Sequence, residues 1–292
     1  MLKSLIMKKF LLIFVGLIVC LLGASGLILE KIILSQLPKV VAAAGKNGTK
    51  ISFDRVEGDS GFANTKLVFI RPRVETPKGV YQADEISLKV SLFSFRTLQG
   101  EISGSQSFNQ MQIRSEPILF KVNLGAEKKI TLTTKKLMIL KPEKAASFQT
   151  MEFDGVLHGK EFLGTLDCTG VSLPIVPIQQ FSEMNKAFLD ISYQLGGREV
   201  MVRKSEFDFG EIQVAVRGRV QKDAFVLDAQ VSGWEKILRE LTARGFINET
   251  KQKIIATALN ILSVRGVLRA PVILEDGVLR VGTYPLMKIK KD

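Results

Sequence analysis

The protein has 292 residues, of which 46% are hydrophobic, and its formal net charge is +12. This length provides a sizeable core in one large domain or in two small ones. The single histidine excludes a multi-histidine metal site, and the two cysteines exclude a disulfide framework. We expect no disulfide between them, because Cys20 falls in an apolar segment and Cys168 stands alone in the rest of the chain.

The segment Phe10–Leu29 is an uninterrupted run of apolar and small residues behind three lysines. At a rise of about 1.5 Å per residue, about 20 residues can cross a hydrocarbon core of roughly 30 Å. Charged side chains are costly at mid-membrane, and none occurs in this run before Glu30. We therefore predict a membrane anchor, with the lysines kept in the cytoplasm and the remaining chain exported. The predicted membrane-anchor residues are Phe10, Leu11, Leu12, Phe14, Leu17, Leu21, Leu22, Leu27 and Leu29.

A cleaved signal peptide is the alternative to an anchor. Its apolar core has about 7–15 residues and is followed by small residues, as Gly23-Ala24-Ser25-Gly26 would provide. The apolar character resumes at Leu27 and continues beyond Glu30. We therefore favour an uncleaved anchor, and both alternatives export the same domain.

The basic charge persists outside the leading lysines, since removing those three leaves +9 (12 − 3). Such an excess favours contact with an anionic surface, for which we predict membrane lipid, either phospholipid or lipopolysaccharide. An exported domain rarely meets nucleic acid, so no nucleic acid partner is predicted. The alternative is that scattered lysines only keep a β-rich protein in solution.

Residues 30–45 have helical composition and should form a membrane-proximal helix that Pro38 kinks or restarts. The period changes to two from Ile51, which predicts a β-rich domain over residues 46–292. We predict the first strands at Ile51–Phe53, Leu67–Phe69 and Ile86–Leu92. Turn residues should separate them at Glu57–Gly61, Thr76–Gly79 and Leu98–Gly100.

The alternation continues through the centre of the chain. Strands are predicted at Met111–Ile113, Ile118–Val122, Ile130–Leu132, Leu137–Leu140, Met151–Leu157, Phe162–Cys168, Ala187–Leu195 and Glu199–Phe209. The clearest pair is Ile212–Val220 with Ala224–Val231, because three residues between two strands suit a hairpin.

Helical spacing then interrupts the strands. Trp234–Phe246 places Trp234, Ile237, Leu238 and Leu241 on one side, and Asn248–Leu262 repeats the pattern. Gly245 should end the first helix and Asn248 should cap the second. Strands at Val264–Leu268, Val272–Leu274 and Val278–Val281 complete the predicted elements.

No motif in the sequence calls for an enzyme. His158 lies where a strand runs into a turn, and we interpret it as an ordinary surface or edge residue. The sequence has no Gly-x-Ser-x-Gly elbow and no phosphate-binding glycine loop. We therefore predict no catalytic residue, no metal and no cofactor.

Two stretches resemble the AsmA-like envelope proteins of Gram-negative bacteria, most closely an uncharacterised family anchored in the inner membrane. The first stretch runs from Phe53 through Leu88, and the second from the helical hairpin through Leu286. The candidate signature residues are Gly58, Gly61, Pro72, Thr76, Pro77, Gly79, Asp276, Gly277, Gly282 and Pro285. They are residues of turns and strands rather than of catalytic sites.

The resemblance implies a long curved antiparallel sheet with an apolar concave face, and a periplasmic location behind a single membrane pass. It also implies a role in envelope biogenesis, in which the apolar face binds or passes lipid acyl chains. An alternating sheet must cover its apolar side with helices, with a second sheet or with a ligand. The alternative function is a structural component of an envelope machine such as type II secretion, whose small inner-membrane component is expected to have a similar fold.

Overall fold

The computed structural model describes residues 27–39, 41–45, 48–61, 64–94, 96–141, 144–173, 183–221, 224–245, 247–275, 277–282 and 284–288. Most of the predicted anchor, residues 10–26, lies outside these ranges, and Leu27–Leu29 begin a helix. Within the described ranges, no helix has both the length and the apolar character needed to span a membrane.

The chain divides into two compact units. Unit 1 comprises Met1–Thr134 and Ile139–Glu143, and unit 2 comprises Lys135–Met138 and Lys144–Asp292. Strands account for 65% of the structure, and they pair antiparallel in both units. The prediction of a mainly β, antiparallel fold is confirmed.

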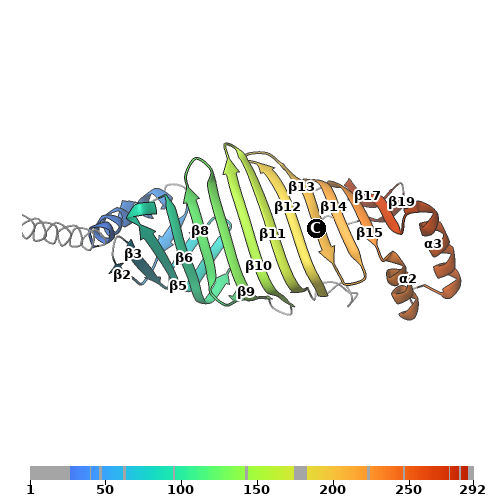
Figure 1. Ribbon diagram of the computed structural model, residues 1–292, viewed down its shortest axis with the longest axis horizontal. Coiled ribbons are helices and arrows are strands. Elements are labelled where there is room, and N and C mark those ends of the chain that lie inside the picture. Colours follow the sequence, from blue (N-terminus) through green and yellow to red (C-terminus); the bar gives the residue numbers. More distant parts are fainter. Residues whose placement is uncertain are drawn as a thin grey trace, which may run out of the picture. The chain divides into compact units, whose positions relative to one another are not determined.

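Unit 1 begins with the predicted helix, which covers residues 27–39 and 41–45 and contains Pro38. Its strands are β1 (Lys50–Ser52), β2 (Arg55–Gly61), β3 (Asn64–Ile70), β4 (Arg73–Thr76), β5 (Gly79–Ser91), β6 (Thr97–Phe108), β7 (Met111–Arg114), β8 (Ile118–Leu124) and most of β9 (Lys128–Lys141). The short 3-10 helix η1 (Leu92–Ser94) follows β5. The long strand β5 pairs with β3 and β4 along one edge and with β6 along the other, as Figure 1 shows.

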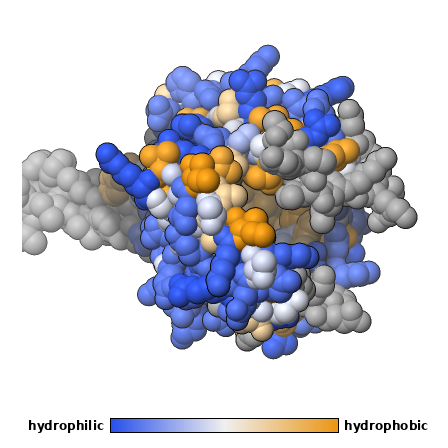
Figure 2. Space-filling view, turned by 90° about the vertical axis from the view of Figure 1, so that its right-hand side faces the viewer, coloured by the Kyte–Doolittle hydropathy of each residue, from blue (hydrophilic) through white to orange (hydrophobic). Residues whose placement is uncertain are grey.

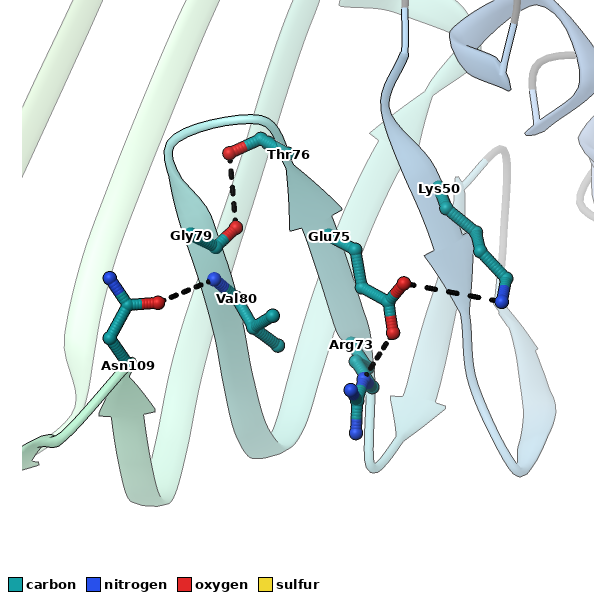
Figure 3. Close-up of polar contacts among 7 residues, drawn as sticks. All are labelled: Lys50, Arg73, Glu75, Thr76, Gly79, Val80 and Asn109. Atoms are coloured by element: carbon teal, nitrogen blue, oxygen red, sulfur yellow. Dashed lines mark hydrogen bonds and ion pairs between the residues drawn. The ribbon is translucent and has the colours of Figure 1, made fainter.

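The predicted turn at Thr76–Gly79 is confirmed, and it joins β4 to β5 (Figure 3). The Thr76 hydroxyl donates to the carbonyl of Gly79 at 3.0 Å, which closes the turn. The amide of Val80 donates to Asn109 Oδ1 at 2.8 Å, so the side chain of Asn109 holds the start of β5. Beside the turn, Glu75 accepts from Arg73 Nε at 2.8 Å and lies 4.0 Å from Lys50 Nζ (Figure 3).

Two other predicted turns are wrong. Glu57–Gly61 forms most of β2, and Leu98–Gly100 lies inside β6. The glycines there serve close packing within strands rather than chain reversal. A Cβ on Gly100 would collide with the ring of Phe120 and with the carbonyl of Ser87. The strands predicted at Ile130–Leu132 and Leu137–Leu140 are one continuous strand, β9.

Unit 2 contains β10 (Lys144–His158), β11 (Glu161–Ser172), β12 (Glu183–Gln194), β13 (Glu199–Asp208), β14 (Gln213–Gln221), β15 (Phe225–Ser232), β16 (Ser263–Val264), β17 (Val267–Glu275), β18 (Val278–Val281) and β19 (Tyr284–Lys288). Strands β10 to β15 pair in chain order, and β17 then pairs with β15 (Figure 1). The predicted hairpin is confirmed as β14 and β15.

Helices α2 (Trp234–Ala243) and α3 (Glu249–Leu262) confirm the predicted helical hairpin between β15 and β17. The amide of Lys251 donates to the side chain of Asn248 at 2.8 Å, as expected of an N-cap. Gly245 adopts φ +74 after the last turn of α2, and its amide donates to the carbonyl of Thr242. This left-handed residue ends the helix as predicted.

Few side chains are fully buried. In unit 2 a small cluster of Cys168, Val171 and Met184 is buried within the sheet, and Ile212, Trp234 and Leu238 are buried near α2. In unit 1 the buried apolar residues of the described strands are Leu67, Ala83 and Val90. Most apolar strand residues therefore remain half-buried rather than enclosed.

Candidate functional site

The strand register of unit 2 places apolar side chains in rows on one face of the sheet. Residues that pair across antiparallel strands share a face, and successive residues of one strand point to opposite faces. One row joins Phe153, Leu166 and Leu189, and the next joins Met151, Cys168 and Ala187. We call this surface the unit 2 apolar face. Its larger side chains are Met151, Phe153, Leu157, Phe162, Leu166, Leu189, Ile191, Val200, Val202, Phe207, Val214, Val216, Val220, Phe225, Leu227, Val231, Leu268, Val272 and Leu274.

A one-residue bulge preserves these rows. Between β12 and β13 the register shifts, so that Ile191 pairs with Val202 and Leu189 pairs with Ser205. The extra residue lies on β13, and the bulged segment contains Arg203. Its guanidinium binds Asp190 Oδ1 at 2.6 Å. The bulge thus keeps an arginine off the apolar rows.

The opposite face of unit 2 carries ion pairs alongside apolar residues such as Val226, which pairs with Ile273. Arg217 lies 2.9 Å from Asp228, and Lys186 lies 3.0 Å from Asp167. Among the pairs that form the apolar rows, by contrast, no aspartate, glutamate, lysine or arginine occurs. In these strand pairs the charged residues therefore lie on one face of the sheet.

The large side chains of the unit 2 apolar face are half-buried, so they still meet solvent. In unit 2, helix α3 contacts α2, β16 and β17. Seen from the end that carries α2 and α3, hydrophobic side chains gather toward the middle and hydrophilic ones surround them (Figure 2). Fully burying one side chain of this size contributes about 1.5–3 kcal/mol. An apolar ligand would complete that burial.

Unit 1 has a second apolar face built by the same alternation. One row joins Phe69, Ile86 and Ile102, and the next joins Leu67 and Leu88 to Gly100 and Phe120. We call it the unit 1 apolar face, and its members are Val56, Leu67, Phe69, Ile86, Leu88, Val90, Leu98, Ile102, Ile118, Phe120, Val122, Ile130 and Leu132.

A carboxylate from the N-terminal helix reaches the edge of the unit 1 apolar face. Glu30 lies over Gly58 of β2, in the space that a Cβ would fill. The hydroxyl of Ser60 donates to Glu30 Oε2, and it lies 3.3 Å from the hydroxyl of Thr65. The absence of a side chain at Gly58 and the two hydroxyls together accommodate the charge. We call this contact the Glu30 latch, and the sequence pattern did not predict it.

The candidate signature residues do not converge on one site. Thr76, Pro77 and Gly79 form the β4–β5 turn, Gly58 receives Glu30, and Gly61 ends β2 beside Asn64. Gly277 and Gly282 adopt φ +72 and +61 in the turns on either side of β18. Pro285 belongs to β19, and Asp276 lies outside the described residues. These residues shape turns and close contacts.

Pro72 is buried and lines a cavity of about 630 Å³ in unit 1. Gln106 lines it too, and Gln106 Oε1 accepts a hydrogen bond from the Tyr81 hydroxyl at 2.9 Å. Burial raises the pKa of Tyr81 to about 12. The rim carries Arg71, which pairs with Asp54 at 3.1 Å. Charges of both signs thus surround this cavity.

The residues with reactive side chains include His158 and Cys168. His158 ends β10 and is exposed. Cys168 is buried on the unit 2 apolar face, where burial and the neighbouring Asp167 raise the pKa of its thiol to about 11. Within the described residues, no three His, Cys, Asp or Glu side chains are grouped to hold a metal ion.

Comparison with known proteins adds no family: no protein-family model matches the chain, and no match was found among curated proteins or solved structures. The two apolar faces and the charges around them are the features of the molecule that bear on its function.

Proposed function

We propose that the protein is an inner-membrane-anchored periplasmic protein of the AsmA-like kind, which binds or passes lipid acyl chains in envelope biogenesis. The observation that carries this proposal is the unit 2 apolar face, whose rows lack charged residues and whose side chains are half-buried. The apolar segment Phe10–Leu29 supports membrane attachment, and the net charge of +12 supports contact with anionic lipid.

An acyl chain fits the chemistry of this surface. Each methylene group removed from water contributes about 0.8 kcal/mol, so a chain that covers several rows gains enough to leave water without any polar contact. A long, uniform ligand also suits a surface built from repeated rows of apolar side chains. The opposite face, with its ion pairs, would remain in contact with water.

The test is lipid analysis of the full chain, extracted from membranes in mild detergent and examined by native mass spectrometry and by organic extraction. We expect co-purifying lipid in the wild-type protein. Leu227→Glu should reduce the bound lipid at least tenfold, because it places a charge in the middle of the unit 2 apolar face.

Val226→Glu is the matched control, since Val226 precedes Leu227 on β15 and points to the opposite face. It is 55% exposed, so a carboxylate there stays hydrated. If both variants fold, as judged by circular dichroism, and both retain lipid equally, the apolar face is not the lipid site. A wild-type protein free of lipid would favour the alternative of a structural component of an envelope machine.

A further inference from the structure

We propose that helix α3 docks on the surface of a bilayer that contains anionic lipid. The helix has an exposed apolar stripe, formed by Ile254, Ala258, Ile261 and Leu262 and called here the α3 stripe. These residues recur at the three- and four-residue spacing of one helical face. This inference stands whether or not the apolar faces carry lipid.

The α3 stripe is unusually exposed for its composition. The exposed fraction is 65% for Ile254, 79% for Ile261 and 64% for Leu262. The other side of the helix is half-buried, and it includes Ile255 and Leu259. Packing within unit 2 therefore accounts for one side of α3 and leaves the stripe without a partner among the described residues.

The apolar exposure continues past the end of the helix. Val264 of β16 follows directly and is 68% exposed. The end of the molecule that carries α2 and α3 displays hydrophobic side chains at its surface (Figure 2). Shallow burial of such residues at the headgroup boundary is the way in which amphipathic helices bind membranes.

The charge around the stripe selects an anionic surface. From Trp234 to Arg269 the sequence has seven basic and three acidic residues. Lys236 and Arg244 form ion pairs with Glu211 and Glu240. Lys251, Lys253, Arg265 and Arg269 have no ion-pair partner within the part of the chain that the structure describes.

Lys251 lies on the same side of α3 as the stripe, about 60° from Ile254 at 100° per residue. Lys253 and Arg265 flank the helix on its other side and at its end. Basic residues near a membrane surface are attracted to anionic lipid. Unpaired cations beside exposed isoleucine and leucine fit a lipid headgroup layer better than an apolar protein groove.

The test measures the depth of the stripe rather than membrane binding, because the predicted anchor alone can hold the full chain on vesicles. Trp234 is the one tryptophan, so Trp234→Phe with Ile261→Trp gives a single reporter on the stripe. The full chain is reconstituted in phosphatidylcholine vesicles with or without 30% phosphatidylglycerol, with bromine on the acyl chains as quencher.

We expect quenching of the Ile261→Trp reporter to be at least threefold greater with phosphatidylglycerol, and to fall with Lys251→Glu and Lys253→Glu together. The control is Trp234→Phe with Val226→Trp, which reports from an exposed position on the face of the sheet opposite the unit 2 apolar face. Equal quenching of both reporters, or none at Ile261, would overturn the proposal.

A second reporter covers the case in which Trp234→Phe does not fold. Ile261→Cys in a Cys20→Ser background accepts a polarity-sensitive dye, while the buried thiol of Cys168 remains unlabelled. A blue shift of the dye emission that occurs only with anionic vesicles supports docking. Disulfide cross-linking of Ile261→Cys between two copies, without a blue shift, would instead assign the stripe to a protein interface and refute membrane docking.

Discussion

The apolar faces of the two units arise from the same alternation of apolar and polar residues along the strands. They differ in their contacts with charged side chains. The unit 1 apolar face receives the carboxylate of Glu30, held by the hydroxyl of Ser60 over the space at Gly58. In the described pairs of unit 2, the corresponding rows contain no charged residue, and a bulge keeps Arg203 at Asp190. At the unit 1 apolar face, hydroxyls and the missing side chain of Gly58 accommodate the charge of Glu30.

Their buried hydroxyls show the same contrast. Thr65 is fully buried and contacts Ser60 within the Glu30 latch. Ser205 is 1% exposed on the unit 2 apolar face, and its hydroxyl has no hydrogen-bond partner within the described structure. The first hydroxyl belongs to a polar network, and the second is isolated among apolar side chains. Unit 2 thus presents the better surface for an acyl chain.

The largest expected effect concerns the buried thiol of Cys168, which probes whether water reaches this part of the unit 2 apolar face. Burial raises its pKa from 9.0 to about 11, so at pH 8 the reactive thiolate should be about 100-fold scarcer than on an unfolded chain. We expect labelling by iodoacetamide to be slowed at least 100-fold in a Cys20→Ser protein, and to accelerate about tenfold per pH unit between pH 7 and 9.

The sign of the linked stability follows from the raised pKa. Below about pH 9 the thiol is neutral in both folded and unfolded chains, and above it the unfolded chain ionises first, so the folded state loses stability as the pH rises. The control is Thr169→Cys with Cys168→Ala, which places a thiol on the opposite face. Similar labelling rates for the two proteins would show that water reaches the Cys168 thiol.

The next largest expected effect is faster amide exchange in the N-terminal helix when the Glu30 latch is broken. Gly58→Ala puts a methyl group where the carboxylate of Glu30 lies, so it should release the N-terminal helix from β2. We expect amide hydrogen exchange over residues 30–39 to accelerate about tenfold, as measured by mass spectrometry. Gly61→Ala is the matched control on the same strand, because its neighbour is the movable end of the Asn64 side chain. Unchanged exchange in Gly58→Ala would refute the latch.

The smallest expected effect is a pair of changes of opposite sign in the free energy of unfolding. Ser205→Ala removes an unpaired buried hydroxyl, so we expect the free energy of unfolding to rise by about 1 kcal/mol. Thr65→Val removes a hydroxyl that contacts Ser60, so we expect a fall of about 1 kcal/mol. Urea denaturation measures both. If both variants change the free energy of unfolding in the same direction, the buried hydroxyls of the two faces do not differ as proposed.

The sequence alone predicted the elements whose signals are local. The alternation of apolar and polar residues predicted most strands, because its period of two follows from the geometry of one strand. Asn248 and Gly245 marked helix ends correctly, because a cap depends on the nearest backbone amides and carbonyls. The Thr76–Gly79 turn was likewise predictable from its own four residues.

Tertiary structure decided what the glycines do and where the charges lie. Gly58 and Gly100 resemble turn residues in the sequence, but each lies inside a strand and makes room for a side chain distant along the chain, Glu30 or Phe120. The pairing of β11 with β12 brings Leu166, Leu189 and Cys168 to one face, and the bulge at Arg203 pairs Val202 with Ile191 on that face. The sequence determines which residues alternate, and the pairing of strands determines which alternating residues form a common surface, because that surface exists only between strands.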